Sequence, residues 1–195
     1  MLSTTAFCCD RRIPLLRLLD MTAATTETSN PSGDDPELVI APPTVDDGPA
    51  LHRLAAEAGG LDVNTRYAYL IWCRDFAATS VIATLDGEPA GFVSGFRRPE
   101  APDTLLVWQV AVGPAARGRG VAGRMLDALF DQVPGVTHME TTVTPDNDAS
   151  NAMFRSFARR NGANFSHKEL FTERQLGDGH EPEFLYRIGP IPNEG

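Results

Sequence analysis

Hydrophobic and polar positions alternate with two different periods along the chain, and together these periods predict an α+β fold. A period of two runs through residues 79–85 and 90–96, and Asp86-Gly87 between them is typical of a hairpin turn. A period near 3.6 marks residues 48–58 and 66–76 as amphipathic helices. The other expected elements are strands over residues 37–41, 105–112, 136–143, 164–170 and 183–188, a helix from Val121 that Pro134 ends, and a helix between Asn147 and Gly162.

The chain is organised around the strand, turn and helix of residues 105–132. Residues 105–112 form a nearly continuous apolar run that Gly113-Pro114 ends, so we expect a strand buried on both faces. We expect residues 99–103, which lead into this strand, to be a loop. The turn 117–122 then leads into the helix, whose apolar residues recur at helical spacing. These residues are Val121, Ala122, Met125, Leu126, Leu129 and Phe130.

A strand, a glycine turn and a helix N-terminus in this order can bind an anion. Gly118 and Gly120 let the backbone approach a ligand closely, and the unpaired amides of the first helical turn favour a phosphate. A Gly-Arg turn that merely joins two core elements is the simpler alternative. Gly123 completes a G-x-G-x-x-G pattern, but no acidic ribose ligand follows on a parallel strand, so we do not expect a dinucleotide site.

Composition and charge narrow the possible partners and the compartment. The formal net charge of −9 argues against a nucleic-acid partner, and Arg117 and Arg119 are then interpreted as local phosphate contacts. No apolar run approaches the length of about 18 residues that a membrane-spanning helix needs, so no membrane partner is expected. Three cysteines, two of them adjacent near the start, give no disulfide framework and favour a cytoplasmic location.

Residues 1–36 differ in composition from the rest of the chain and are expected to be a disordered N-terminal extension. The short apolar patch at 13–19 is interrupted by Pro14 and Arg17, and no small-residue cleavage site follows it, which argues against a signal peptide. Met21 opens a stretch rich in Thr, Ser, Ala and acidic residues, which is composed like a disordered tail. Met21 is a second candidate for the start of translation beside Met1. If translation starts at Met21, residues 1–20 are not part of the native protein.

The turn at residues 117–122 resembles motif A of the GNAT acyltransferase superfamily, [QR]-x-x-G-x-[GA]. The resemblance implies a mixed, mostly antiparallel sheet that is splayed at an acyl-CoA cleft and flanked by helices. It also implies that acetyl-CoA is the co-substrate, with no metal, and that the pyrophosphate lies on the amides of this turn. The cofactor-binding residues it implies on the strand, turn and helix are Val110, Ala111, Val112, Arg117, Gly118, Arg119, Gly120, Val121 and Ala122.

The helix after residue 147 resembles motif B of the same superfamily, N-x-x-A-x-x-x-Y. Asn147 and Ser150 occupy the first two motif places, and Phe154 stands where the tyrosine is usual. In the superfamily that tyrosine often protonates the departing thiolate, which phenylalanine cannot do. Either the thiolate leaves unassisted, since a thiol pKa is about 8.5, or Tyr67, Tyr69 or water supplies the proton.

Acyl transfer to an amine needs positioning and the loss of one proton from the amine. We expect strands 105–112 and 136–143 to splay, so that the pantetheine arm pairs between them. Glu140, on the second strand, is the first candidate base, unless it faces solvent. Asp62 is the second acidic candidate, unless it is a turn or helix-cap aspartate.

Further blocks resemble one family within the superfamily, the L-2,4-diaminobutyrate acetyltransferases of ectoine biosynthesis. The likeness runs over residues 37–191, which we take as one catalytic domain. The blocks are residues 61–70, 73–76, 91–93, 108–112, 140–145 and 180–183. The resemblance implies acetylation of the side-chain amine of L-2,4-diaminobutyrate to the N4-acetyl product, and a homodimer.

The residues fit a small substrate that carries two amines and one carboxylate. Asp62 and Glu140 can bind the ammonium groups, and Trp108 can form an apolar and cation–π wall unless it is a core residue. The further candidates for substrate binding are Tyr67, Tyr69 and a loop at His180. The carboxylate could be bound by Arg66, by Arg74 or by the Tyr67 and Tyr69 hydroxyls. Two alternatives remain, a GNAT enzyme for another small diamine or amino acid and a non-enzymatic acyl-CoA-binding module.

Overall fold

A computed structural model of the chain describes residues 36–59, 61–177 and 179–192. The expected extension at residues 1–36 lies outside these residues, apart from Pro36. The strands are β1 (Leu38–Ala41), β2 (Val81–Leu85), β3 (Glu88–Arg98), β4 (Ala101–Val112), β5 (His138–Val143), β6 (Phe165–Phe171) and β7 (Glu183–Ile188). The helices are α1 (Gly48–Ala58), α2 (Arg66–Asp75), α3 (Val121–Gln132), α4 (Asp148–Arg160) and the short α5 (Glu173–Leu176).

The strands form one mixed sheet in the order β1-β2-β3-β4-β5-β7-β6. Every neighbouring pair is antiparallel except β4 and β5, which run parallel because α3 connects them across one face. The β2–β3 hairpin turns at Asp86 (φ 52°) and Gly87 (φ 82°), the left-handed pair that a two-residue turn requires. The predicted α+β class and the mostly antiparallel sheet are therefore confirmed.

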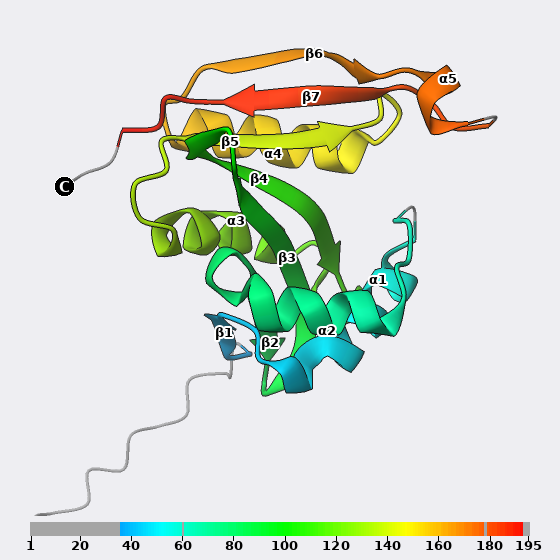
Figure 1. Ribbon diagram of the computed structural model, residues 1–195. Helices are drawn as coiled ribbons and strands as arrows, with labels where there is room; N and C mark the ends of the chain where they lie inside the picture. Colours follow the sequence, from blue (N-terminus) through cyan, green and yellow to red (C-terminus); the bar gives the residue numbers. More distant parts are fainter. Residues whose placement is uncertain (1–35, 60, 178, 193–195) are drawn as a thin grey trace, which may run out of the picture. The chain divides into compact units, whose positions relative to one another are not determined.

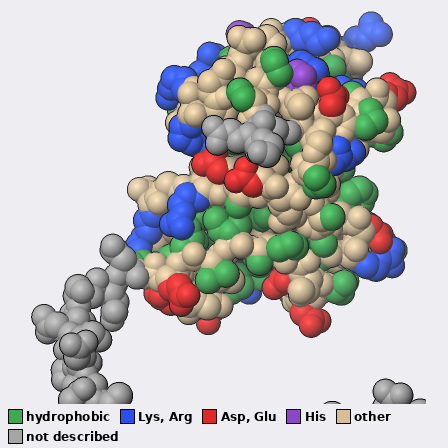
Figure 2. Space-filling view, turned by 90° about the vertical axis from the view of Figure 1, so that its left-hand side faces the viewer, with side chains coloured by type: hydrophobic (Ala, Val, Ile, Leu, Met, Phe, Trp, Pro, Cys, Tyr) green, Lys and Arg blue, Asp and Glu red, His purple; other side chains and the backbone are tan. Residues whose placement is uncertain are grey.

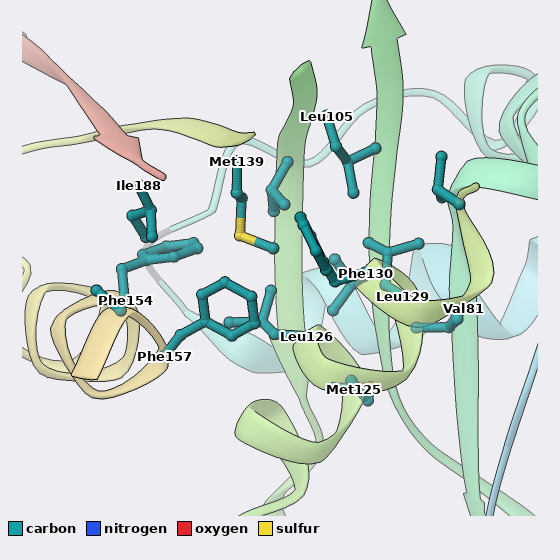
Figure 3. Close-up of a cluster of buried hydrophobic side chains, with 14 of the residues drawn as sticks. Val81, Leu105, Met125, Leu126, Leu129, Phe130, Met139, Phe154, Phe157 and Ile188 are labelled. Carbon is teal, nitrogen blue, oxygen red and sulfur yellow. The ribbon is translucent and has the colours of Figure 1, made fainter. Parts of the chain in front are cut away.

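Helices cover the sheet on both faces and bury two apolar clusters (Figure 1). We call the side covered by α3 and α4 the α3 face, and the side covered by α1 and α2 the α1 face. On the α3 face, Leu105, Val107 and Met139 of the sheet pack with the inner residues of α3 and α4 (Figure 3). On the α1 face, Phe92 and Ala111 pack with residues of α1 and α2.

Strands β4 and β5 separate soon after they pair. Their parallel register runs only from Thr104–His138 to Val107–Thr141, whereas β4 continues to Val112 and β5 to Val143. Beyond this point the edges of the two strands that face each other leave backbone groups without a strand partner. The predicted splay between these two strands is confirmed.

The expectation that residues 105–112 are buried on both faces is wrong. Leu105, Val107 and Ala111 are buried, whereas Trp108 is 53% exposed and Val110 and Val112 are half-buried. An apolar run can also result when one side of a strand faces a helix and the other faces a cleft. The apolar residues of this strand therefore line a surface opening as well as the core.

Two local boundaries also differ from expectation. Residues 101–103, predicted to be a loop, extend β4, because the β3–β4 hairpin pairs as far as Arg98 and Ala101. The polar segment between β6 and β7 contains α5, which Thr172 caps: the side chain of Gln175 accepts hydrogen bonds from the Thr172 backbone amide and hydroxyl. The sequence marks this helix only by its capping residues, and it has no apolar repeat at helical spacing. Capping residues alone are a weak signal for a helix.

Several large apolar side chains remain exposed, and in Figure 2 hydrophobic side chains gather across the middle of the face shown. Three exposed residues, Val63, Tyr67 and Trp108, lie on segments next to the splay. Leu170 and Phe171 lie on β6, the last strand of the sheet. No helix of the described residues is both long and apolar enough to cross a membrane.

Cys73 of α2 is 2% exposed, and burial, together with the Asp47 carboxylate, raises the pKa of its thiol from 9.0 to about 11. As pH rises, the Cys73 thiol of the unfolded chain loses its proton before that of the folded chain does. The stability that the buried, protonated thiol contributes to the fold is therefore present below pH 9 and is lost toward pH 11. We expect the stability difference between the wild type and Cys73→Ala to shrink by about 1–2 kcal/mol over this range. Urea unfolding at intervals between these pH values measures it; a difference that does not change with pH would contradict the assignment.

Candidate active site

The glycine turn between β4 and α3 leaves open space above the helix N-terminus. Gly118 (φ 75°) and Gly120 (φ 71°) adopt left-handed conformations that other residues rarely take. A Cβ atom built on either residue would meet no heavy atom within 4 Å. The glycines are therefore required by the backbone conformation, and the space beside them is free for a ligand that approaches the first amides of α3.

A cavity of about 360 Å³ lies beside this turn, on the α3 face of the splay. Residues from β4, the turn, α3 and α4 line it, namely Val110, Val112, Ala116, Arg117, Gly118, Gly120, Val121, Ala122, Ala149, Ser150 and Met153. The structure thus brings together most of the residues that the sequence predicted for the cofactor. It adds Ala116, Ala149 and Met153, which no motif position marked.

Four predicted cofactor residues do not line this cavity. Ala111 belongs to the cluster on the α1 face, and Phe154 is 2% exposed in the core beside Met139 and Ile188 (Figure 3). Asn147 caps α4, where its side-chain oxygen accepts a hydrogen bond from the Ser150 amide at 3.0 Å. Arg119 is exposed and lines a neighbouring cavity with Arg124.

Arg117 lines the cavity, but its guanidinium forms hydrogen bonds with backbone carbonyls of β4 and α1. The side chain donates to the carbonyl of Val112 at 3.2 Å, and to those of Glu57 at 2.9 Å and Ala58 at 3.3 Å. Glu57 and Ala58 are the last residues of α1, so their carbonyls have no partner within the helix. The first arginine of the motif therefore ties the turn to the end of α1 through Nε and Nη2.

An irregularity in β4 turns two successive side chains toward the α1 face. Ser94 pairs with Gln109 and Gly95 with Val107, which leaves Trp108 as the extra residue of a β-bulge. The Trp108 ring lies 5.5 Å from that of Trp72 on α2, and Phe76 and Phe96 continue this aromatic group. Trp108 is therefore an exposed wall at the splay rather than a core residue.

Gln109 holds the loop that carries Asp62 against the same bulge. Its amide donates to the Asp62 carbonyl at 2.9 Å and accepts from the Tyr69 hydroxyl at 3.2 Å. The Tyr69 hydroxyl also accepts from the Asn64 amide at 3.4 Å. Tyr69 is thus a buried loop anchor, and the exposed Asp62 side chain sits on a loop fixed at the cleft.

The structure does not bring Tyr67 and His180 into this group by any described contact. Tyr67 is 70% exposed on α2, and His180 is exposed beyond α5. The third tyrosine of the chain, Tyr186, was not predicted for the site. It is buried on β7 and donates a hydrogen bond to Asn151 of α4. The Tyr186 hydroxyl therefore contacts α4, but Tyr186 lies on β7, which is outside motifs A and B.

Glu140 lies on the α1 face and not in solvent. Strand alternation directs the Glu140 side chain to the face of the sheet away from Met139, which lies on the α3 face. Glu140 pairs with Leu106 of β4 and Arg187 of β7. One carboxylate oxygen accepts from Arg187 Nη1 at 2.5 Å and the other from Arg98 Nη1 at 2.7 Å. The sequence did not identify either arginine. Each is more than 40 residues from Glu140 along the chain, and no motif marks them.

The two faces of the splay therefore offer different chemistry. The α3 face has a cavity with glycine amides and apolar strand residues, which suits a phosphate-bearing acyl carrier. The α1 face has Asp62, an aromatic wall and the Arg98–Glu140–Arg187 cluster, which suits a small charged molecule. A group bound from one face can meet a group bound from the other between β4 and β5. Among the described residues no set of three or more His, Cys, Asp or Glu could hold a metal ion.

Comparison with known proteins agrees with this arrangement. The model of the acetyltransferase (GNAT) family matches residues 49–158. The chain is 52% identical over 164 residues to the L-2,4-diaminobutyric acid acetyltransferase of Streptomyces coelicolor, covering 82% of this chain and 96% of that protein. It is 49% identical over 158 residues to the enzyme of the same name from Nocardia farcinica, covering 80% and 82%.

A solved structure is similar to the whole described fold. It is the diaminobutyrate acetyltransferase EctA from Paenibacillus lautus, in complex with its substrate L-2,4-diaminobutyric acid and coenzyme A. The two chains superimpose with a TM-score of 0.77 at 36% sequence identity, over 82% of this chain and 99% of that one. The sheet and its flanking helices are therefore those of an acetyltransferase.

The glycine turn yields a prediction with a matched control. In Gly120→Ala the left-handed conformation costs about 1–2 kcal/mol, and the new methyl group enters the space beside the α3 amides. We expect the Kd for acetyl-CoA, measured by calorimetry, to rise at least about tenfold. Gly135, after the other end of α3, has a similar φ of 75° and equally open surroundings. Gly135→Ala should lose similar stability and keep its Kd. Equal Kd values in both variants would contradict the cofactor site.

Proposed function

The chain belongs to the GNAT family of acetyltransferases and, within it, to the L-2,4-diaminobutyric acid acetyltransferases, and on that premise we propose its reaction. The enzyme transfers the acetyl group of acetyl-CoA to the side-chain amine of L-2,4-diaminobutyrate. The product, N4-acetyl-L-2,4-diaminobutyrate, serves ectoine synthesis. The observation that carries the proposal is the opening between β4 and β5, which connects the glycine cavity to the charged α1 face.

The cavity on the α3 face is proposed to hold acetyl-CoA. The amides of Gly118 to Ala122 and the positive end of the α3 dipole favour its pyrophosphate. The free edges of β4 and β5 beyond Val107 and Thr141 can pair with the amide groups of the pantetheine arm. This places the thioester in the splay, where the carbonyl is open to attack from the α1 face. Holding both reactants in this way supplies a large part of the rate.

The attacking amine must be neutral, which for a pKa of about 10.4 costs roughly 4–5 kcal/mol at pH 7. Glu140 was the first candidate base, but both of its oxygens already accept hydrogen bonds from arginines. We propose that Glu140 acts by orienting these arginines. Asp62, exposed at the cleft, then binds the α-ammonium group, and water at the mouth of the splay accepts the proton that the attacking side-chain amine loses.

We propose that the coenzyme A thiolate leaves without a tyrosine from α4. Phe154 carries no proton and is buried away from the cavity, and the Tyr69 hydroxyl is engaged by Gln109. A thiol pKa of about 8.5 makes the thiolate a moderately good leaving group near neutral pH. Water at the open cleft then supplies the proton.

We also propose a homodimer in the cytoplasm. Strand β6 ends the sheet, six of its seven residues are exposed, and Leu170 and Phe171 on it are 37% and 41% exposed. An exposed edge strand with apolar side chains is a surface that native proteins usually cover. A second copy would cover it. The unpaired, buried Cys73 is in keeping with a reducing compartment.

The proposed function is tested by thiol release from acetyl-CoA, with and without L-2,4-diaminobutyrate. We expect amine-dependent release, and NMR of the product should place the acetyl group on the γ-nitrogen. Ornithine and lysine, which lengthen the side chain by one and two methylenes, should be acetylated with steeply falling kcat/KM, because the distance from anchor to thioester is fixed.

Two outcomes would contradict the proposal. Tight acetyl-CoA binding without amine-dependent release would favour the non-enzymatic binding module. Higher kcat/KM for ornithine or lysine than for diaminobutyrate would assign the enzyme to another small amine.

A further inference from the structure

We propose that Arg98 and Arg187, held in place by the buried Glu140, bind the α-carboxylate of the amino-acid substrate. This inference rests on the proposed function and deepens it, because it assigns a partner to the substrate carboxylate, for which the sequence offered Arg66, Arg74 and the hydroxyls of Tyr67 and Tyr69. The Tyr69 hydroxyl is engaged by Gln109, and Tyr67 is 70% exposed. Arg74 is exposed, and its guanidinium forms two hydrogen bonds with the neighbouring Asp75. Arg66 is exposed at the start of α2.

Glu140 is buried at the base of the cluster, and the two arginines above it are partly exposed to solvent. The Glu140 side chain is 3% exposed, whereas those of Arg98 and Arg187 are 37% and 40% exposed. Each arginine contacts Glu140 through Nη1, and a guanidinium carries five N–H groups in a planar fork. The forks therefore keep donors for a second acceptor at the surface. Two positive charges against one negative charge leave a net charge of +1, which favours an anion.

The position of the cluster matches the length of the substrate. Glu140 pairs with Leu106, one residue before the last β4–β5 pair at Val107 and Thr141, so the cluster lies directly below the splay. One residue along a strand is about 3.3 Å. The carboxyl carbon and γ-nitrogen of diaminobutyrate are four bonds apart, at most about 5 Å. A carboxylate on the arginines thus allows the γ-amine to reach the splay.

The opposite charge lies on the other side of the opening. The Asp62 loop is fixed to Gln109 at the bulge of β4, one residue beyond Trp108, whereas the arginines contact Glu140 of β5. An α-amino acid carries its ammonium and carboxylate on one carbon. A negative group and a positive pair at the two sides of Trp108 can therefore fix its orientation, so that the side-chain amine rather than the α-amine faces the thioester.

A purely structural ion pair is the competing explanation. Arg98 on β3, Glu140 on β5 and Arg187 on β7 do link three strands, and such a cluster could exist only to hold them. The two explanations differ in one measurable respect. A structural cluster affects all amine substrates alike, whereas a carboxylate subsite affects only substrates that carry a carboxylate.

The test compares L-2,4-diaminobutyrate with 1,3-diaminopropane, which has the same reacting amine and no carboxylate. The wild type should prefer diaminobutyrate in kcat/KM by at least about 100-fold. In Arg187→Gln, and separately in Arg98→Gln, this preference should fall about 10- to 100-fold, chiefly through the KM for diaminobutyrate. Diaminopropane kinetics should change much less.

Controls separate binding from folding. Arg53 forms a long, exposed ion pair with Glu57 on α1, so Arg53→Gln removes the same charge from a residue outside the cluster and should keep the preference. Each variant is checked by urea unfolding, since loss of one arginine leaves Glu140 with one partner. If Arg187→Gln does not fold, Arg187→Lys retains the charge but not the fork, and should still lower the preference.

The outcomes for the two proposals are distinct. A wild type that acetylates neither amine would refute the proposed function. A wild type that acetylates diaminobutyrate, while the variants retain the preference, would refute the carboxylate subsite and leave the function in place. Equal kcat/KM for the two amines in the wild type would also refute the subsite.

Discussion

The early separation of β4 and β5 is the constraint on which the rest of the structure depends. The two strands are parallel neighbours because α3 crosses one face, yet they pair over four residues each and then diverge. A closed sheet would hide the backbone edges of both strands and divide the molecule into two unconnected faces. The opening instead lets the glycine cavity on the α3 face and the charged group on the α1 face act on one bond.

On the α1 face, buried polar residues support the groups that are exposed at the cleft. The bulge in β4 exposes Trp108 while Gln109 stays buried and fixes the Asp62 loop. Glu140 is buried in the same way, under two partly exposed arginines. In both cases a buried polar residue with satisfied hydrogen bonds positions a neighbour at the cleft, which is how a precise site is kept rigid.

Features encoded by a few neighbouring residues could be predicted, and features made by distant residues could not. The hairpin at Asp86-Gly87 and the left-handed glycines at 118 and 120 follow from local conformational preference, and the structure has both. The pairing of Glu140 with Arg98 and Arg187 joins residues 42 and 47 positions apart. Arg117 donates to α1 carbonyls up to 60 positions away, so its motif position alone suggested a phosphate contact. The same apolar run in β4 fits a buried strand or a strand lining a cleft, and only the splay distinguishes them.

The central claim, that the two faces meet through the opening between β4 and β5, is tested most directly with a bisubstrate ligand. Such a ligand joins the sulfur of coenzyme A to the γ-nitrogen of diaminobutyrate through one acetyl unit. Because the second half then binds at high effective concentration, we expect calorimetry to give a Kd at least about 100-fold below that of coenzyme A. The ligand should also compete with both substrates. Binding no tighter than that of coenzyme A would contradict the account.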